Sequence, residues 1–179
     1  MDTRMRYMAM ARENEKIIKQ GFYEAGGEVF HFASPLSRLE EADIYGPEAL
    51  EEMVSSLSAP FGKGRISVVE GDTLAYGAEG VLNFANAFTP GGGYLYGASS
   101  QEEALCRDST LYASLSGKNG LLYYEENRRR QSMYGSCGMV FSPFVEIFRS
   151  ADGTLFGPPR QTAVITAPAI DLRGTAGNG

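Results

Sequence analysis

Hydrophobic and polar residues alternate along the chain in patterns that change from helical to strand-like. Apolar residues recur at helical spacing between residues 4 and 25, which predicts a long first helix. A double glycine at 26–27 is expected to end it. Residues 28–32 then alternate as in a strand, and a further helix is expected from Pro47, because proline is favoured in the first turn.

The middle and the end of the chain carry the short apolar runs of a sheet. Strands are expected over Arg65–Glu70, 81–85, 138–141, 145–149 and 162–166. The run Val81–Ala85 is apolar at most positions, which is typical of a strand covered on both faces. A helix is expected over about Ser100–Leu115. Strands that alternate with helices predict an α/β layered domain.

Length and charge narrow the class of protein. A chain of 179 residues with 43% hydrophobic residues is expected to form one domain over residues 1–173, followed by a flexible tail or a truncation point at 174–179. Within it we expect a helical region over about 4–60 and a sheet core over about 65–170. The net charge of −6 argues against duplex DNA as a partner. Neither a membrane span nor a signal peptide is expected, which predicts a cytoplasmic protein.

The two cysteines and the single histidine restrict the chemistry further. Two cysteines are too few for a disulfide scaffold, and one histidine excludes a His-rich metal site. Cys106 lies in the helix expected after residue 100 and is expected to be a packed thiol, because no base for a nucleophilic role is evident.

Three consecutive glycines, Gly91–Gly93, connect an expected strand to an expected helix. Glycines allow the backbone to approach a ligand closely and can direct N–H groups at an anion, to which the N-terminus of the helix adds its dipole. The segment matches neither the Rossmann nor the Walker glycine pattern. A mobile surface loop is an equally acceptable interpretation. Tyr94 and Tyr96 beside the glycines could stack on a ligand or simply cover the loop.

Two adjacent carboxylates open the helix after the glycines. Ser100 and Glu103 match a capping box, in which Glu103 would only bond back to the Ser100 amide. The functional interpretation is that one carboxylate acts as acid or base. Because neighbours on a helix diverge by about 100° around its axis, Glu102 and Glu103 cannot face one atom equally. One would transfer the proton and the other would orient the substrate.

The glycines and the acidic pair together resemble a known signature. Pro90–Gly93, a spacer of seven residues and Gln101–Glu103 are similar to the GGG…QEE motif of the poly(ADP-ribose) glycohydrolases, and the surrounding stretches resemble the bacterial, microbial-type branch. These stretches are 81–85, 105–112, 142–149 and 166–169. The resemblance implies a macrodomain-like three-layer α/β/α fold with a mixed central sheet and ADP-ribose in a crevice at the strand ends.

The resemblance also implies roles for individual residues. Glu103 matches the general acid of the family, and Glu102 matches the residue that holds ribose hydroxyls. The remaining substrate-binding positions are Gly91, Gly92 and Gly93 along the diphosphate and ribose, Asn86 at the same ribose, Gln101 in the motif, and Asp72 at the adenine amino group.

The implied reaction is hydrolysis of the O-glycosidic bond between ADP-ribose units. A carboxylic acid protonates the leaving oxygen and, as a carboxylate, then activates water, so neither a metal nor another cofactor is required. An acid that works near neutral pH needs a raised pKa, which burial and a neighbouring carboxylate would supply.

One departure from the family bears on activity. Family members continue past Thr166–Ala169 with a helix, a strand and a second glycine-rich loop, and this chain ends at Gly179. We therefore expect weaker diphosphate binding and self-association through an open strand edge. Two alternatives stay open: a macrodomain that binds ADP-ribose without cleaving it, and a hydrolase of another ADP-ribosyl linkage.

Overall fold

The centre of the molecule is a four-stranded mixed sheet. The computed structural model describes residues 2–57, 64–76, 79–130 and 135–168. The strands lie in the order β3-β5-β6-β4, with bounds Asp43–Tyr45 for β3, Met139–Arg149 for β5, Leu155–Pro168 for β6 and Gly80–Ala85 for β4. β5 is antiparallel to β3 and β6, whereas β4 is parallel to β6. The predicted α/β fold with a mixed sheet is thus confirmed, and β3 joins the sheet from the region expected to be helical.

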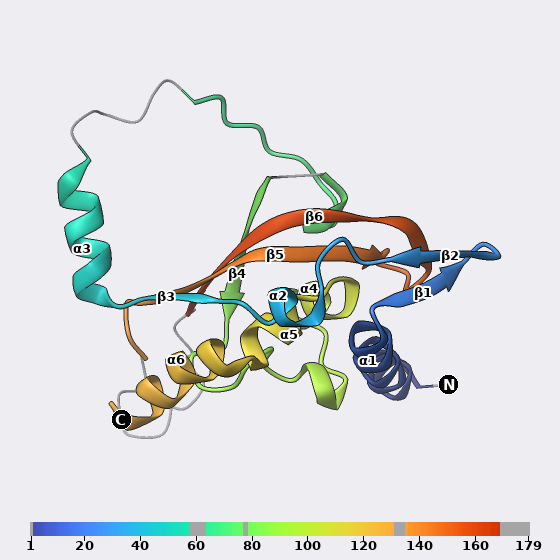
Figure 1. The fold of residues 1–179 in the computed structure, drawn as a ribbon. Helices are drawn as coiled ribbons and strands as arrows, with labels where there is room; N and C mark the ends of the chain where they lie inside the picture. The colour runs from blue at the N-terminus through green and yellow to red at the C-terminus, as the bar shows by residue number, and fades with distance from the viewer. Residues whose placement is uncertain (1, 58–63, 77–78, 131–134, 169–179) are drawn as a thin grey trace.

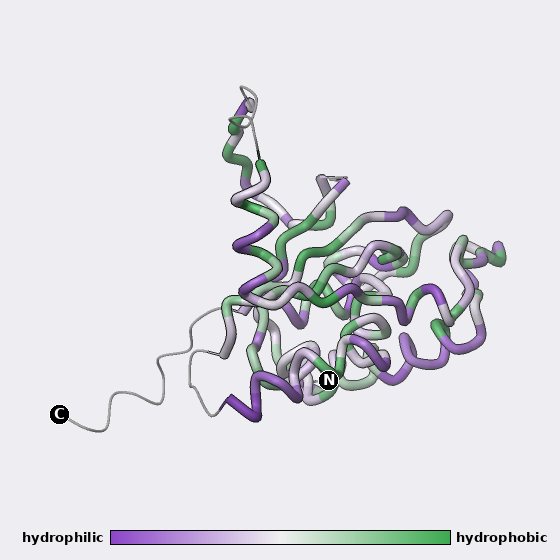
Figure 2. Tube along the Cα trace, turned by 60° about the vertical axis from the view of Figure 1, so that its left-hand side comes forward, coloured by the Kyte–Doolittle hydropathy of each residue, from purple (hydrophilic) through white to green (hydrophobic). Residues whose placement is uncertain are grey.

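The two long strands of this sheet form a hairpin across the molecule. A turn at Asp152–Gly153 connects β5 to β6, and Gly153 adopts a φ of +91°, a conformation that favours glycine. Apolar side chains of the sheet pack on those of a helix to make the main core; these are Val140, Val145, Ile147, Val164, Leu111 and Leu115. Figure 2 shows hydrophobic stretches in the centre of the molecule and hydrophilic stretches mostly toward its periphery.

Three helices, α4 (Gln101–Asp108), α5 (Leu111–Ser116) and α6 (Lys118–Arg129), lie on one side of the sheet (Figure 1). The single helix expected over about 100–115 is therefore wrong in one respect, since it is interrupted between α4 and α5. Ser109 is extended there and pairs with Ile147 of β5 as an isolated bridge. Tertiary pairing with the sheet has overridden the local helical pattern.

The N-terminal segment also differs from the expectation. α1 (Thr3–Gln20) ends before residue 25, because Gly21 adopts a left-handed φ of +81° and its N–H donates to the Ile17 carbonyl. The residues that follow form a hairpin of β1 (Phe22–Ala25) and β2 (Glu28–His31), which confirms the strand expected over 28–32. A short helix, α2 (Leu36–Leu39), comes next.

A segment between β3 and β4 stands away from the core. α3 (Pro47–Ser56) begins at the expected proline but buries none of its residues. The strand expected over Arg65–Glu70 is wrong: the segment has no regular structure, and Ile66 and Val68 are 93% and 96% exposed. Among the described residues no strand pairs with it, so its alternating pattern has no ladder to join. A 3-10 turn, η1 (Thr73–Tyr76), follows (Figure 1).

One face of β4 remains open to solvent among the described residues. Val81, Asn83 and Ala85 are buried, whereas Leu82 and Phe84 are exposed beside Ile165 of β6. The cover expected on both faces of this strand is therefore not found in the described part of the chain. None of the described helices is long and apolar enough to cross a membrane. The tail expected at 174–179 lies outside the described residues.

A buried carboxylate, for which the described residues supply no cationic partner, ties the sheet to the segment after β2. Glu146 is fully buried and accepts hydrogen bonds from the N–H groups of Ala33 at 2.9 Å and Ser34 at 2.8 Å. We predict that Glu146→Gln lowers the free energy of unfolding by about 2 kcal/mol, because an amide can accept only one of these bonds. Urea unfolding would measure this, with the exposed Glu125→Gln as a control expected to change stability by less than about 0.5 kcal/mol. Equal stabilities of the two variants would contradict the assigned role.

Candidate active site

The glycine loop begins directly after β4 and folds on a local turn. The Asn86 side-chain oxygen accepts hydrogen bonds from the N–H groups of Phe88 at 2.8 Å and Thr89 at 2.9 Å. Asparagine favours such turns because its short side chain can replace a backbone acceptor. The chain then runs through the glycines and η2 (Tyr94–Tyr96) into α4.

Both carboxylates at the start of α4 hold this loop. Glu102 Oε2 accepts from the Asn86 N–H at 2.8 Å, and Glu103 Oε1 accepts from the Gly93 N–H at 2.8 Å. The capping-box alternative is wrong, because Ser100 makes no side-chain capping bond and Glu103 points at the loop instead. The loop is therefore held against α4 near both of its ends rather than free on the surface.

The glycines are required because the two carboxylates approach their backbone closely. A Cβ on Gly92, whose φ is +55°, would lie 2.6 Å from Glu103 Oε1 and 2.9 Å from Glu102 Oε2. A Cβ on Gly93 would lie 2.7 Å from the Ala98 Cβ. The N–H groups of the glycines are engaged within the protein: Gly92 donates to the Thr89 carbonyl, Gly93 donates to Glu103, and the Gly91 N–H lowers the pKa of Glu102 against the effect of burial. The glycine N–H groups are expected to point at an anion, and within the protein the anionic groups beside them are the carboxylates of Glu102 and Glu103.

One oxygen of each carboxylate remains uncommitted. Glu102 Oε1 and Glu103 Oε2 are buried and have no hydrogen-bond partner among the described residues. The two side chains are only 4% and 6% exposed. Each glutamate is therefore fixed through one oxygen while the other remains available for chemistry or for a ligand.

Burial changes the acidity of this pair. Burial in the first place, and the charge of Glu103 to a smaller extent, raise the pKa of Glu102 from its ordinary value of 4.5 to about 7, although hydrogen bonds from the Asn86 N–H and the Asn83 side chain oppose the shift. Glu102 is thus close to half-protonated at neutral pH. The raised pKa is expected at the general acid, which the resemblance assigns to Glu103, whereas this shift concerns the carboxyl of its neighbour Glu102.

This shift predicts a loss of stability as the pH rises. The folded protein holds the Glu102 proton up to about pH 7, and an unfolded chain releases it near 4.5, so stability falls between these values. Glu102 alone contributes a loss of about 3 kcal/mol by the usual conversion. Asp108, whose pKa burial also raises to about 7, adds to it.

Urea unfolding at pH 5 and pH 8 tests this expectation. The wild-type chain should be less stable at pH 8, and Glu102→Gln should remove its own share of the difference. A difference that is unchanged in Glu102→Gln would show that this carboxyl is already ionised in the folded protein at pH 5.

Gln101, the first residue of the motif, docks α4 on the edge of β4. Its side chain donates to the Leu82 carbonyl at 2.7 Å and accepts from the Phe84 N–H at 2.8 Å. These are the backbone groups that a neighbouring strand would use. Gln101 therefore fixes the start of α4, and with it the carboxylates, against the end of β4.

Asp72 is not brought to the acidic pair. Its side chain accepts from the Leu74 N–H at 2.8 Å, and the Leu74 carbonyl accepts from Arg160. Arg160 lies near the start of β4, because Ala163, three residues later, pairs with Gly80, the first residue of β4. The glycine loop follows the last residue of β4. Asp72 and the loop therefore lie at opposite ends of this strand. Asp72 borders a cavity of about 330 Å³, which is also lined by Leu74, Ile147, Arg149, Phe156 and Arg160.

The helix α6, which was not predicted from the sequence, supports the loop. Asn127 donates from its side chain to the Ala87 carbonyl at 2.8 Å, and Arg128 donates to the Phe88 carbonyl at 2.6 Å. The signal that could have found this helix is the spacing of its buried residues, Gly120, Tyr123, Tyr124 and Asn127.

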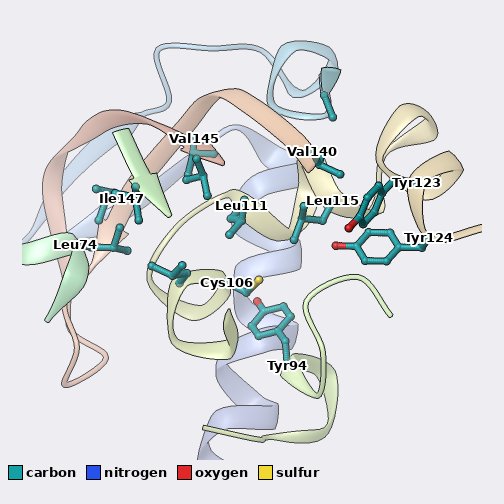
Figure 3. Packing of buried hydrophobic residues seen from close by; sticks show 14 of the residues in the cluster. Leu74, Tyr94, Cys106, Leu111, Leu115, Tyr123, Tyr124, Val140, Val145 and Ile147 are labelled. Carbon is teal, nitrogen blue, oxygen red and sulfur yellow. The ribbon is translucent and has the colours of Figure 1, made fainter. Parts of the chain in front are cut away.

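Aromatic and sulfur-containing side chains pack behind the glycines. Tyr94 is buried, its ring points from the loop into the core toward Cys106, and its hydroxyl accepts from the Asn14 side chain at 3.2 Å (Figure 3). Tyr96 is 64% exposed. Cys106 is fully buried, which confirms the packed thiol.

The mixed sheet, with a glycine loop locked to an acidic pair at the end of one strand, defines a macrodomain-like α/β domain with the carboxylates of a glycosidase. Comparison with protein families gives the particular family. The chain belongs to the microbial-type PARG (poly(ADP-ribose) glycohydrolase) catalytic-domain family, whose model matches residues 11–150. The resemblance seen in the sequence is thereby confirmed, as is the glycosidase class of the family.

Solved structures agree with this assignment. The poly(ADP-ribose) glycohydrolase from Thermomonospora curvata is 34% identical, with a TM-score of 0.88 over 97% of this chain and 68% of that chain. The same enzyme bound to the inhibitor ADP-HPD gives a TM-score of 0.86 at 34% identity, over 97% of this chain and 66% of that chain. A Deinococcus radiodurans enzyme in complex with ADP-ribose is 34% identical, with a TM-score of 0.71 over 79% of this chain and 61% of that chain.

This chain therefore spans about two thirds of the length of these enzymes. A comparison with curated protein sequences gives no significant match.

Proposed function

We propose that this chain hydrolyses poly(ADP-ribose) at its ribose–ribose bonds and releases ADP-ribose, with Glu103 as general acid and base. The observation that carries the proposal is the state of the Glu103 carboxyl. Its Oε1 is fixed by the Gly93 N–H, and its buried Oε2 has no partner among the described residues. A carboxyl held through one oxygen can present the other to a bound substrate in a single orientation.

In the proposed reaction Glu103 gives its proton to the oxygen that leaves the anomeric carbon. The C–O bond breaks through an oxocarbenium-like state, and the Glu103 carboxylate then removes a proton from the attacking water. Water thereby adds to the anomeric carbon, and the acid is restored. Glu102 holds ribose hydroxyls through its free oxygen, and its partial protonation at neutral pH allows it to donate as well as accept.

The remaining predicted contacts belong to the same proposal. Gly91–Gly93 allow the ribose and diphosphate to approach the backbone without Cβ atoms, and Asn86 contacts the same ribose. Gln101 contributes by fixing α4 on β4. Asp72 would meet the adenine only at the far end of an extended ligand, because it lies at the opposite end of β4. Self-association and a cytoplasmic location stay predictions.

Calorimetry with ADP-ribose, together with a chain-shortening assay on poly(ADP-ribose), tests the proposal. Binding together with release of ADP-ribose is the expected result. Binding without release would contradict hydrolysis and favour a macrodomain that only holds ADP-ribose. Release from another ADP-ribosyl linkage, but not from the polymer, would move the activity to that linkage.

A further inference from the structure

A fully buried tyrosine on α6 lies against the acidic pair without a partner of its own. Tyr124 is 0% exposed, and its hydroxyl has no hydrogen-bond partner among the described residues. Leaving a buried hydroxyl unpaired is unfavourable, so such groups in folded proteins almost always meet a polar atom. Figure 3 shows the hydroxyl pointing into the core toward Cys106, which lies one helical turn after Glu102 on α4.

Glu102 is the first charged group that acts on the Tyr124 hydroxyl. Burial and then the charge of Glu102 hold the pKa of Tyr124 well above its ordinary value of 10. Glu102 Oε1 is itself buried and unpartnered in the described part of the chain. Two buried polar atoms without a partner among the described residues therefore face the same region. The Tyr124 hydroxyl can donate a hydrogen bond, and Glu102 Oε1, when ionised, can only accept one.

The other groups near Glu102 are already engaged or are less suited to be the donor to its free oxygen. The Asn83 side chain and the Gly91 N–H lower the pKa of Glu102 against the effect of burial, and Asn83 also donates to Thr166 Oγ1 at 3.2 Å. Glu103 is an acid of the same kind and is bonded to Gly93. The Tyr123 hydroxyl donates to the Gly138 carbonyl at 3.4 Å. Burial raises the pKa of the Cys106 thiol, which is a weak hydrogen-bond donor.

We propose that the Tyr124 hydroxyl donates to a water that in turn donates to Glu102 Oε1, and that Tyr124 is thereby a positioning residue of the acidic pair. Its place on α6 supports this, because the same helix holds the start of the loop through Asn127 and Arg128. One buried helix face thus positions both the loop and the carboxylate. The effect on the reaction rests on the proposed function, whereas the water bridge between the two side chains does not.

The test is a direct titration of Glu102 in the full chain without substrate. The side-chain carboxyls of ¹³C-labelled glutamate would be followed by NMR, and Glu102→Gln would assign the signal. Removing a donor from an ionised carboxylate disfavours the charged form, so Tyr124→Phe should raise the pKa of Glu102 by about one pKa unit. The matched control is Tyr23→Phe, which removes the hydroxyl of another buried tyrosine, bonded to the Phe156 carbonyl far from the pair. It should leave the pKa of Glu102 unchanged.

An unchanged pKa in Tyr124→Phe, or an equal rise in both variants, would overturn the proposal. If Tyr124→Phe fails to fold, the wild-type chain still gives an answer. The ring carbon that carries the Tyr124 hydroxyl should shift with the same midpoint as Glu102, and Glu102→Gln should abolish that shift; a ring signal that ignores the titration of Glu102 would contradict the bridge. A chain that proves unable to cleave the polymer would refute the proposed function and leave this measurement intact.

Discussion

The Glu103→Gln variant should retain ADP-ribose binding and lose hydrolysis of poly(ADP-ribose) by about 10²- to 10⁴-fold, the usual contribution of general acid–base catalysis. The amide keeps the shape of the side chain, and its oxygen can still accept from the Gly93 N–H. Its NH₂ group would then occupy the place of the free Oε2 and could not give up a proton as an acid. The rate of ADP-ribose release, measured beside calorimetric affinity, separates the two effects.

Glu102→Gln provides the contrast to this variant. Because Glu102 is proposed to hold ribose hydroxyls, its replacement should weaken ADP-ribose binding as well as turnover. Full activity in Glu103→Gln would remove the acid assignment and leave the Glu103 side chain only as an anchor of the loop. Loss of activity in Glu102→Gln alone would exchange the two roles.

The Gly92→Ala variant should lose both binding and activity. The left-handed φ of +55° costs an alanine about 1–2 kcal/mol. The new methyl group would also lie 2.6 Å from Glu103 Oε1, so the carboxyl and the loop must separate. With overpacking at about 1–3 kcal/mol, the total destabilisation is about 3 kcal/mol. Thermal unfolding should shift by roughly 10 °C, at about 2–4 °C for each kcal/mol in a chain of this size.

Gly26→Ala is the matched control. Gly26 has a similar φ of +60°, but nothing lies within 4 Å of the position that its Cβ would take. It should cost about 1–2 kcal/mol of stability through backbone strain alone and leave ADP-ribose binding unchanged. If Gly92→Ala bound ADP-ribose as tightly as Gly26→Ala, the close contact between loop and carboxylates would not matter for the ligand.

The sequence predicted correctly those elements that depend on short-range features, such as a proline in the first turn of a helix or a run of apolar residues in a strand. Pro47 begins α3, and the apolar run 81–85 forms β4, as expected. Such features failed where tertiary pairing decides. Gly21, not the later double glycine, ends α1, and Ser109 divides the expected helix because it pairs with β5. Residues 65–70 have a strand pattern, yet no described strand pairs with them.

In the candidate site, too, local sequence features were predictable and contacts that depend on tertiary packing were not. The glycine triplet and the acidic pair were recognisable from their spacing, but the sequence alone could not separate a capping box from a loop anchor. The 2.8 Å bond from the Gly93 N–H to Glu103 makes that distinction, because it depends on how the loop folds back on α4. Likewise, Tyr124 and Asn127 lie more than 20 residues beyond the motif and reach it only through the packing of α6.

The roles proposed above all require that ADP-ribose binds across the glycine loop against Glu102 and Glu103. Backbone amide NMR of the labelled wild-type chain during addition of ADP-ribose would locate the ligand. The amide signals of Asn86 and Gly91–Gly93 should shift together on binding, while those of the β1–β2 hairpin stay in place. Shifts confined to the residues around the Asp72 cavity, with the glycine amides unmoved, would contradict this binding mode.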